Sequence, residues 1–233
     1  MINMEVHVSW GLEVMRRLPE LSICIGTITH VCNDKENEQI RQLKKAVYEG
    51  VRAKYNIETL KDDSTVRAYR DFYWKLNIDP TKTRPSGEAL LRRVLHSEEL
   101  PTISTVVDAY NLGSMKTIIP ISGFDIDRLN PPFHVRFAKS GETFIGIGMN
   151  KPMPLEEKML VLSDERQVLC IYPYRDADLT KITMQTRNVM IIGYGAPGIT
   201  NQQLEETIQT TLAYIKQVAH GETGLEKVLN SSQ

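Results

Sequence analysis

Hydrophobic positions in the first third of the chain predict two strands followed by two helices. Apolar and polar residues alternate over 4–10, which is typical of a half-buried strand. Residues 21–31 are mostly apolar or β-branched and predict a second strand. Apolar side chains then recur at helical spacing over 35–55 and again over 64–77, so two amphipathic helices are expected there.

The pattern beyond residue 80 predicts helices on either side of a β-rich middle. Helices are expected from Ser86, over 103–115, and from Thr200, which forms a capping-box pattern with Gln203. Short apolar runs separated by Pro, Gly and Asp predict strands at 117–121, 133–138, 143–148, 159–163, 167–172 and 188–193. The tail after His220 is expected to add a short helix and then fray.

This grouping of elements favours an α+β fold over an alternating α/β fold, because the strands cluster between early and late helices. No internal repeat, low-complexity tract or Gly/Ser-rich linker divides the chain. We expect residues 1–80 to pack on the same core as a domain formed by residues 81–233.

Composition is that of a globular protein without a strong charge. The 233 residues carry 28 Lys and Arg against 29 Asp and Glu, and the mean hydropathy is −0.28. This balance excludes a strongly basic nucleic-acid binder as a description of the whole chain. No apolar run approaches the roughly 18 residues of a membrane span, and the N-terminal sequence predicts no secretory signal. Three cysteines without a C-x-x-C motif favour reduced thiols and a cytoplasmic location.

Charge is unevenly distributed along the chain. Residues 35–96 contain 14 Lys and Arg against 9 Asp and Glu, a net charge of +5, and the remainder carries −6. One interpretation is a pair of solvated amphipathic helices. The other is a surface that contacts a phosphate backbone.

Two sequence patterns that resemble cofactor or metal sites are better explained by structure. Residues 193–198 read Gly-Tyr-Gly-Ala-Pro-Gly, but no second strand with a terminal acidic residue follows, and Pro197 lacks an amide donor. A tight strand-to-helix turn is therefore expected there, and such a turn can line a pocket. Cys24, His30 and Cys32 lack the paired spacing of a zinc site, so we expect neither a metal nor a cofactor.

The segment from Tyr172 to Asp178 concentrates polar chemistry directly after an apolar run. Asp176 and Asp178 lie two residues apart and share a face if the backbone is extended. Together with Arg175, and with Tyr174 beside it, they could hold an ammonium group or orient a water molecule. The alternative is a charged surface loop with an Arg–Asp pair.

Further polar residues lie within apolar surroundings. Asp108 and Asn111 fall three residues apart in a predicted helix and share a face. Ser122 lies in the segment Pro-Ile-Ser-Gly-Phe-Asp. Buried polar groups need partners, so these residues are either structural anchors or the lining of a pocket.

Several motifs in the second half of the chain resemble the B3/B4 domain of the phenylalanyl-tRNA synthetase β subunit. They are Arg-Pro at 84–85, Leu-Leu-Arg at 90–92, Thr-Val-Val-Asp-Ala-Tyr-Asn at 105–111, Pro-Ile-Ser-Gly-Phe-Asp-Ile-Asp-Arg-Leu at 120–129, Val-Arg-Phe-Ala at 135–138, Gly-Glu at 141–142, Leu-Val-Leu-Ser-Asp at 160–164, and the Thr-bearing segment 183–189. The match spans roughly residues 84–200. It implies an α+β fold of packed sheets flanked by helices, and a pocket that hydrolyses mischarged tRNA with a positioned water.

The resemblance assigns positions in that pocket. Ser122 stands where the family has a histidine, and Asp178 where it has a tyrosine-reading glutamate, with Arg175 and Asp176 just upstream. The pocket floor falls at the segment Tyr194, Gly195 and Ala196. A serine and a shorter carboxylate beside an arginine imply a more polar or differently charged ligand than tyrosine.

The leading hypothesis is a free-standing editing protein that hydrolyses a mischarged aminoacyl-tRNA. Ser122, Asp176 and Asp178 are the candidate catalytic residues. The candidate substrate-binding residues are Asp108, Asn111, Tyr174, Arg175, Tyr194, Gly195 and Ala196, and the basic helical part would contact tRNA. Two alternatives stay open: a non-catalytic module that binds RNA or an amino acid, and a hydrolase of a small metabolite.

Overall fold

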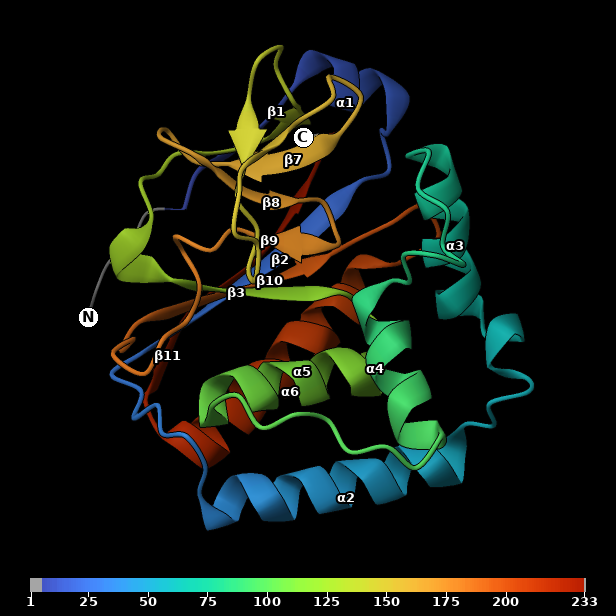
Figure 1. The fold of residues 1–233 in the computed structure, drawn as a ribbon, viewed down its shortest axis with the longest axis vertical. Coiled ribbons are helices and arrows are strands. Elements are labelled where there is room, and N and C mark those ends of the chain that lie inside the picture. Colours follow the sequence, from blue (N-terminus) through green and yellow to red (C-terminus); the bar gives the residue numbers. More distant parts are fainter. Residues whose placement is uncertain (1–5, 233) are drawn as a thin grey trace.

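Two β-sheets packed face to face form the centre of the protein, and helices cover the outer face of one of them (Figure 1). The computed structural model describes residues 6–232. Sheet A contains, in spatial order, β1 (Val8–Trp10), β4 (Phe133–Phe137), β7 (Leu160–Ser163), β8 (Val168–Ile171) and β9 (Arg175–Asp176). Sheet B contains β11 (Glu222–Asn230), β2 (Ser22–Thr29), β10 (Val189–Tyr194) and β3 (Ile121–Asp125). This arrangement is an α+β fold, as expected.

The helices form a layer on the side of sheet B that faces away from sheet A (Figure 1). Helices α5 (Thr105–Thr117) and α6 (Asn201–Ala219) pack on the sheet, and α2 (Glu38–Lys54) packs on them from outside. Gly26 of β2 makes the close approach of α6 possible, because a Cβ there would lie 2.5 Å from Ile208. The other helices are α1 (Leu12–Arg17), α3 (Ser64–Lys75) and α4 (Ser86–Leu95), with 3-10 turns at Leu60–Asp62 and Ile126–Arg128.

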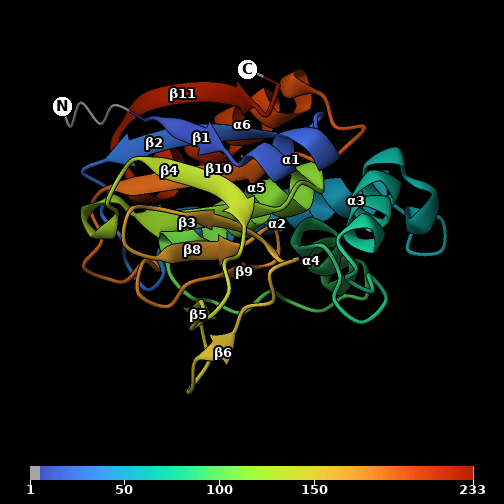
Figure 2. The same ribbon diagram turned by 90° about the horizontal axis from the view of Figure 1, so that it is seen from above.

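Side chains along the strands of sheet A point alternately to its two faces, and each face contributes to a separate hydrophobic core. In β8, Cys170 faces sheet B, where its Sγ lies 3.1 Å from the hydroxyl of Tyr194. Its neighbour Ile171 faces the opposite side and joins a small second core with Phe144 and Val161. The hairpin of β5 (Thr143–Phe144) and β6 (Met153–Pro154) lies on that outer side and projects from the body (Figure 2). Both sides of sheet A are therefore covered.

Buried tyrosines join the sheets at one end. The hydroxyl of Tyr172 lies within hydrogen-bond distance of the carbonyl oxygens of Ser22 (3.2 Å) and Gly195 (2.9 Å). Tyr69 of α3 donates to the carbonyl oxygen of Tyr194 at 2.5 Å. The rings of Tyr172 and Tyr194 meet edge to face, with centroids 4.6 Å apart. Every buried hydroxyl in this group therefore has a partner.

The helices predicted over 35–55 and 64–77 are confirmed as α2 and α3. The capping box at Thr200 is confirmed too, since its side chain accepts from the amide of Gln203 and the Gln203 side chain accepts in return. Ser86 begins α4 as predicted. The strand predicted over 4–10 is seen as β1, and Met4 and Glu5 lie outside the described residues.

Three predictions about the type or extent of elements are wrong. The strand expected at 143–148 spans only Thr143–Phe144. The tail after His220 is not a helix but β11, which pairs antiparallel with β2. The strand expected at 117–121 begins only at Ile121, because α5 continues to Thr117. Ile118 then ends that helix in the left-handed region, with φ of 62°.

Within residues 6–232, no helix is long and apolar enough to cross a membrane.

Alanine substitutions at two helical glycines are expected to change the free energy of unfolding in opposite directions. A Cβ on Gly87 of α4 would lie 2.5 Å from the backbone carbonyl carbon of Ile118, and backbone cannot move aside cheaply. We expect Gly87→Ala to lower the free energy of unfolding by about 2 kcal/mol. Gly50 of α2 has nothing within 4 Å of its Cβ position, so Gly50→Ala should raise the free energy of unfolding by up to about 1 kcal/mol. Urea unfolding of both variants tests this, and equal effects would contradict the packing at Gly87.

Candidate functional site

Ser122 and Asp176 meet between the two sheets. Ser122 lies on β3, the edge strand of sheet B, and Asp176 on β9, the edge strand of sheet A. In register, Asp176 pairs with Cys170, so its side chain points toward sheet B as that of Cys170 does. The hydroxyl of Ser122 donates a short hydrogen bond to Oδ1 of Asp176. The strand edges thus bring together two candidate catalytic residues that are 54 positions apart.

Other polar side chains lie next to this pair. Tyr194 of β10 and Cys170 of β8 are hydrogen-bonded to each other beside it. Tyr110 of α5 packs over Gly123 on the helix-covered face of β3, where a Cβ would lie 2.8 Å from its ring, and burial together with the charge of Asp176 raises the pKa of Tyr110. We call Ser122, Asp176, Cys170 and Tyr194 the seam cluster.

Desolvation dominates the electrostatics of the seam cluster. Asp176 is half-buried as a residue, yet protein atoms crowd its carboxyl group, and this desolvation raises the pKa of Asp176 to about 7. The hydrogen bond from Ser122 opposes the shift. Burial also raises the pKa of Cys170 and of Tyr194, and the negative charge of Asp176 contributes in both cases. Asp176 therefore changes protonation state near neutral pH, which suits a group that gives and takes protons.

Asp178 and Arg175 do not join the seam cluster. Asp178 forms an ion pair with Lys181 at 2.6 Å, and both side chains are more than a third exposed. Arg175 pairs in register with Ile171, so it lies on the outer side of sheet A, where its Cδ would contact a Cβ on Gly146. It is exposed. The structure therefore separates the two carboxylates, and only Asp176 is enclosed.

Asp108 and Asn111 lie on α5, and the contacts of Asp108 are with α2 and the loop before α5. Asp108 is buried, forms an ion pair with Lys44 of α2 at 2.7 Å, and accepts the amide of Ile103 at 2.9 Å. These contacts tie α5 to α2 and to the loop before α5. Asn111 is half-buried on the same helix.

The expected pocket floor is filled by protein atoms. Tyr194, Gly195 and Ala196 are all buried, and the amide of Gly195 donates to the carbonyl oxygen of Ser22 at 2.8 Å. A Cβ on Gly195 would lie 2.5 Å from that same oxygen, so only glycine fits. Tyr174 lines a separate cavity of about 130 Å³ against Leu76, Met159 and neighbouring side chains. Of the sequence-predicted residues, Ser122, Asp176 and Tyr194 come together.

Sequence reasoning missed Tyr110, Cys170 and Lys181. The only sequence signal for Cys170 is its place two residues before Tyr172 in a buried strand. Tyr110 lies inside the segment that resembles the family, but nothing marks it as a neighbour of Asp176. These contacts arise from sheet packing and have no local signature.

Residues 193–198 form the predicted turn between a strand and a helix. Gly193 belongs to β10, Gly195 approaches the backbone of Ser22, and Gly198 adopts φ of 89° just before α6. In the described part of the chain, no group of three or more His, Cys, Asp or Glu side chains is placed to hold a metal ion.

Part of the positive charge in the helical region is neutralised internally. Glu88 of α4 is buried and accepts from Arg70 at 2.5 Å and from Arg92 at 2.6 Å. Burial alone would raise the pKa of Glu88, but these hydrogen bonds outweigh it and lower the pKa. A cavity of about 430 Å³ beside them is lined mainly by basic side chains: Lys82, Arg84, Arg92, Arg93 and His96, together with Ala89 and Glu98.

Comparison with known proteins gives a family match. A family model described as the B3/4 domain matches residues 68–222. The phenylalanine–tRNA ligase beta subunit of Neisseria meningitidis serogroup B is 27% identical over 115 residues, which cover 49% of this chain and 14% of that protein. The subunit of the same name from Thermococcus onnurineus is 28% identical over 104 residues, covering 36% of this chain and 18% of that protein. The matches thus span less than a fifth of either relative.

Among solved structures, the crystal structure of an N-terminal fragment of the phenylalanyl-tRNA synthetase beta-subunit from Pyrococcus horikoshii superposes with a TM-score of 0.49 at 13% identity. The alignment covers 97% of this chain and 50% of that one.

The raised pKa of Asp176 predicts how stability depends on pH. The neutral carboxyl is favoured in the folded state, so its stabilisation is complete below the ordinary value of 3.8 and is lost as pH rises through about 7. The full shift corresponds to about 4 kcal/mol, and partial solvent access reduces the expectation to about 2 kcal/mol. Asp176→Asn cannot ionise and should escape this loss. Relative to the wild type, it should gain stability progressively between about pH 4 and about pH 7 in urea unfolding, with no further gain at higher pH.

Glu157→Gln, which removes one exposed carboxylate, is the matched control and should follow the wild-type profile. Parallel pH profiles for Asp176→Asn and the wild type would show that the carboxyl group is not desolvated.

Proposed function

The chain belongs to the B3/4 domain family, and from this membership we propose that it acts on aminoacyl-tRNA by hydrolysing the ester between amino acid and RNA. The relatives' name, phenylalanine–tRNA ligase beta subunit, refers to both halves of such a substrate. The matched region spans less than a fifth of either relative, and the step that we propose for it is the removal of a wrongly attached amino acid.

The observation that carries the proposal is the pair of Ser122 and Asp176. A carboxylate with a pKa of about 7 can accept a proton from water at neutral pH and return it within one reaction. In the proposed step, Asp176 takes a proton as the water oxygen bonds to the ester carbonyl carbon. The bond to the ribose oxygen then breaks, and that oxygen receives the proton. Ser122 orients the carboxylate through its hydrogen bond.

Other residues support substrate binding at the rim. Asp178 lies at the surface beside the seam cluster and can receive the ammonium group of the amino acid when Lys181 moves aside. On α4, the cavity lined by Lys82, Arg84 and Arg93 offers positive charge to phosphates of the RNA.

A second candidate function is a module that binds RNA or an amino acid without chemistry. The observation that favours it is the filled space at the seam: Tyr194, Gly195 and Ala196 are buried, and the hydroxyl of Tyr194 is hydrogen-bonded to Cys170. In that case the same residues hold a ligand at the rim, and no ester is cleaved.

A deacylation screen tests the proposal. Total tRNA charged separately with each amino acid is incubated with the protein, and release of the amino acid is followed over time. We expect release from one or two mischarged species, with a rate that rises as pH passes through about 7. Asp176→Asn should slow release by about 100-fold or more, and Ser122→Ala by a smaller factor. Affinity for the RNA should stay within about twofold in both variants.

Glu157→Gln is again the control and should release at the wild-type rate. Absence of release from every charged species by folded protein would overturn the hydrolase. RNA binding in the same preparation would then favour the non-catalytic module, while equal loss of rate and affinity in Asp176→Asn would count against a catalytic role.

A further inference from the structure

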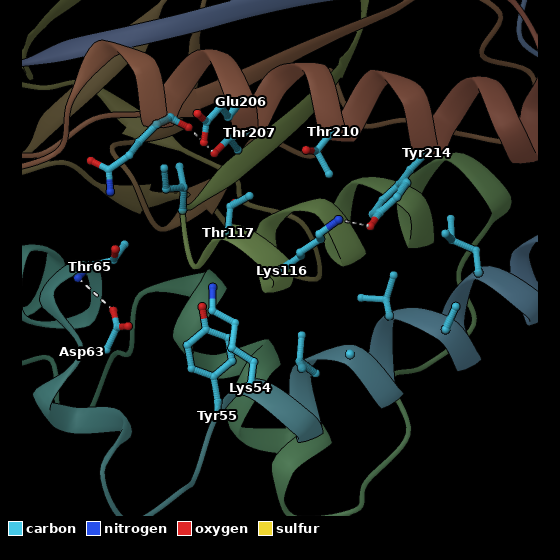
Figure 3. Close-up of a pocket in the computed structure, with 17 residues that line it drawn as sticks. Lys54, Tyr55, Asp63, Thr65, Lys116, Thr117, Glu206, Thr207, Thr210 and Tyr214 are labelled. Atoms are coloured by element: carbon cyan, nitrogen blue, oxygen red, sulfur yellow. Dashed lines mark hydrogen bonds between the residues drawn. The ribbon is translucent and has the colours of Figure 1, made fainter.

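Another cavity lies in the helical layer, on the far side from the seam cluster. It has a volume of about 670 Å³ and lies between α2, the end of α5, α6 and the start of α3 (Figure 3). Helices α5 and α6 separate it from sheet B (Figure 1). Ala46 and Gly50 line it from α2, and these small side chains leave the space open. We call this cavity the helical groove. Its volume lies in the range of sites for small molecules.

Two lysine–tyrosine pairs line the helical groove from different walls. Lys54 and Tyr55 rise from the end of α2, and the Lys54 ammonium lies 4.8 Å from the centre of the Tyr55 ring. On the opposite wall, Lys116 of α5 donates to the hydroxyl of Tyr214 of α6 at 3.0 Å. Among residues 6–232, neither lysine has a carboxylate within 4.0 Å. Both ammonium groups can therefore bind an anion without breaking an ion pair.

Carboxylates and hydroxyl groups complete the polar lining. Asp63 caps α3, using Oδ1 to accept the amides of Thr65 and Val66, while no hydrogen bond to its Oδ2 occurs among the described residues. Glu206 of α6 accepts from Gln202 through Oε1. These two acceptors lie in the same groove as the lysines, and Thr210 lines it from α6 between Glu206 and Tyr214 (Figure 3).

The floor of the helical groove is apolar. Leu43, Val47, Val51 and Ile119 line it and are buried. A flat ring can therefore lie against this floor or against the exposed side of either tyrosine.

This combination of groups matches one class of ligand. Lysine ammonium groups bind phosphate, aromatic faces stack on nucleobases, and carboxylates accept hydrogen bonds from ribose hydroxyls. The formal charges of the lining residues cancel, with Lys54 and Lys116 against Asp63 and Glu206. A balanced lining fits one phosphate with its sugar and base better than a long polyanion, which needs an unbroken basic track.

We propose that the helical groove binds a single ribonucleotide unit, with its phosphate between Lys54 and Lys116, its base on Tyr55 or Tyr214, and its ribose hydroxyls on Asp63 or Glu206. The unit is either a free mononucleotide or one residue of an RNA strand. This site is independent of the ester hydrolysis proposed for the seam cluster.

Calorimetric titration of the full chain tests the proposal. The probes are adenosine 5′-monophosphate, its 2′-deoxy counterpart, a short single-stranded oligoadenylate, and inorganic phosphate. We expect adenosine 5′-monophosphate or the oligoadenylate to bind, and the deoxy counterpart to bind more weakly. The double variant Lys54→Met with Lys116→Met should raise the Kd by about tenfold or more. Lys45→Met, on an exposed position of α2 outside the groove, should leave the Kd within about twofold.

A second variant keeps the charges and removes the space. Gly50→Trp should abolish binding while the unfolding midpoint stays near that of the wild type, because nothing lies within 4 Å of the Gly50 Cβ position. Binding of the mononucleotide identifies a free nucleotide as the ligand, and binding of the oligoadenylate alone identifies an RNA strand.

Three results would overturn the assignment. The first is that neither adenosine 5′-monophosphate nor the oligoadenylate binds. The second is that neither the lysine double variant nor Gly50→Trp changes the Kd. The third is that inorganic phosphate binds as tightly as the nucleotides. Asp176→Asn should bind the nucleotide normally, so a failure of ester hydrolysis and a failure of the groove give different results.

Discussion

The face-to-face packing of the two sheets is the constraint on which the other features of the molecule depend. Polar groups caught between the sheets must be paired, because an unpartnered buried donor or acceptor costs about 1–3 kcal/mol. The hydroxyl of Tyr172 is paired with the carbonyl oxygens of Ser22 and Gly195, and the hydroxyl of Tyr194 is paired with the thiol of Cys170. Where the edge strands β3 and β9 meet, the hydroxyl of Ser122 donates a hydrogen bond to the carboxyl group of Asp176. The candidate chemistry is therefore located where sheet packing leaves a carboxyl group enclosed but still close to solvent.

The same packing decides where the rest of the chain can lie. Sheet A covers one face of sheet B, so helices α5 and α6 must cover the other, and α2 must pack outside them. Small residues set the spacing of this layer: Gly26 brings α6 onto the sheet, while Gly50 leaves open space against α2. The molecule thus offers two chemically different places, an enclosed carboxyl group at the seam and an open groove of mixed charge among the helices.

Local signals in the sequence predicted the helices well, since amphipathic spacing and caps act within a few residues of one another. The capping box at Thr200 is the clearest case. The resemblance to the B3/B4 domain is confirmed by the family match over 68–222. Long-range pairing had no such signal. The residues after His220 mix exposed polar positions with three half-buried apolar ones, Leu225, Val228 and Leu229, and this local pattern does not identify β11, whose partner lies near the other end of the chain. Asp176 and Asp178 were equivalent in sequence. They differ because β9 is two residues long and the chain leaves the strand before Asp178.

The pairing of β11 with β2 also affects how the protein is made. Glu222 and Thr29 are neighbours in sheet B although 193 positions separate them. On a ribosome, β2 emerges long before β11 is synthesised, and an apolar strand without its neighbour is open to pairing with other chains. Contacts of such long sequence separation also slow folding, because a large loop must close before they form. During translation, β2 therefore lacks both of its neighbours in sheet B until most of the chain has been synthesised.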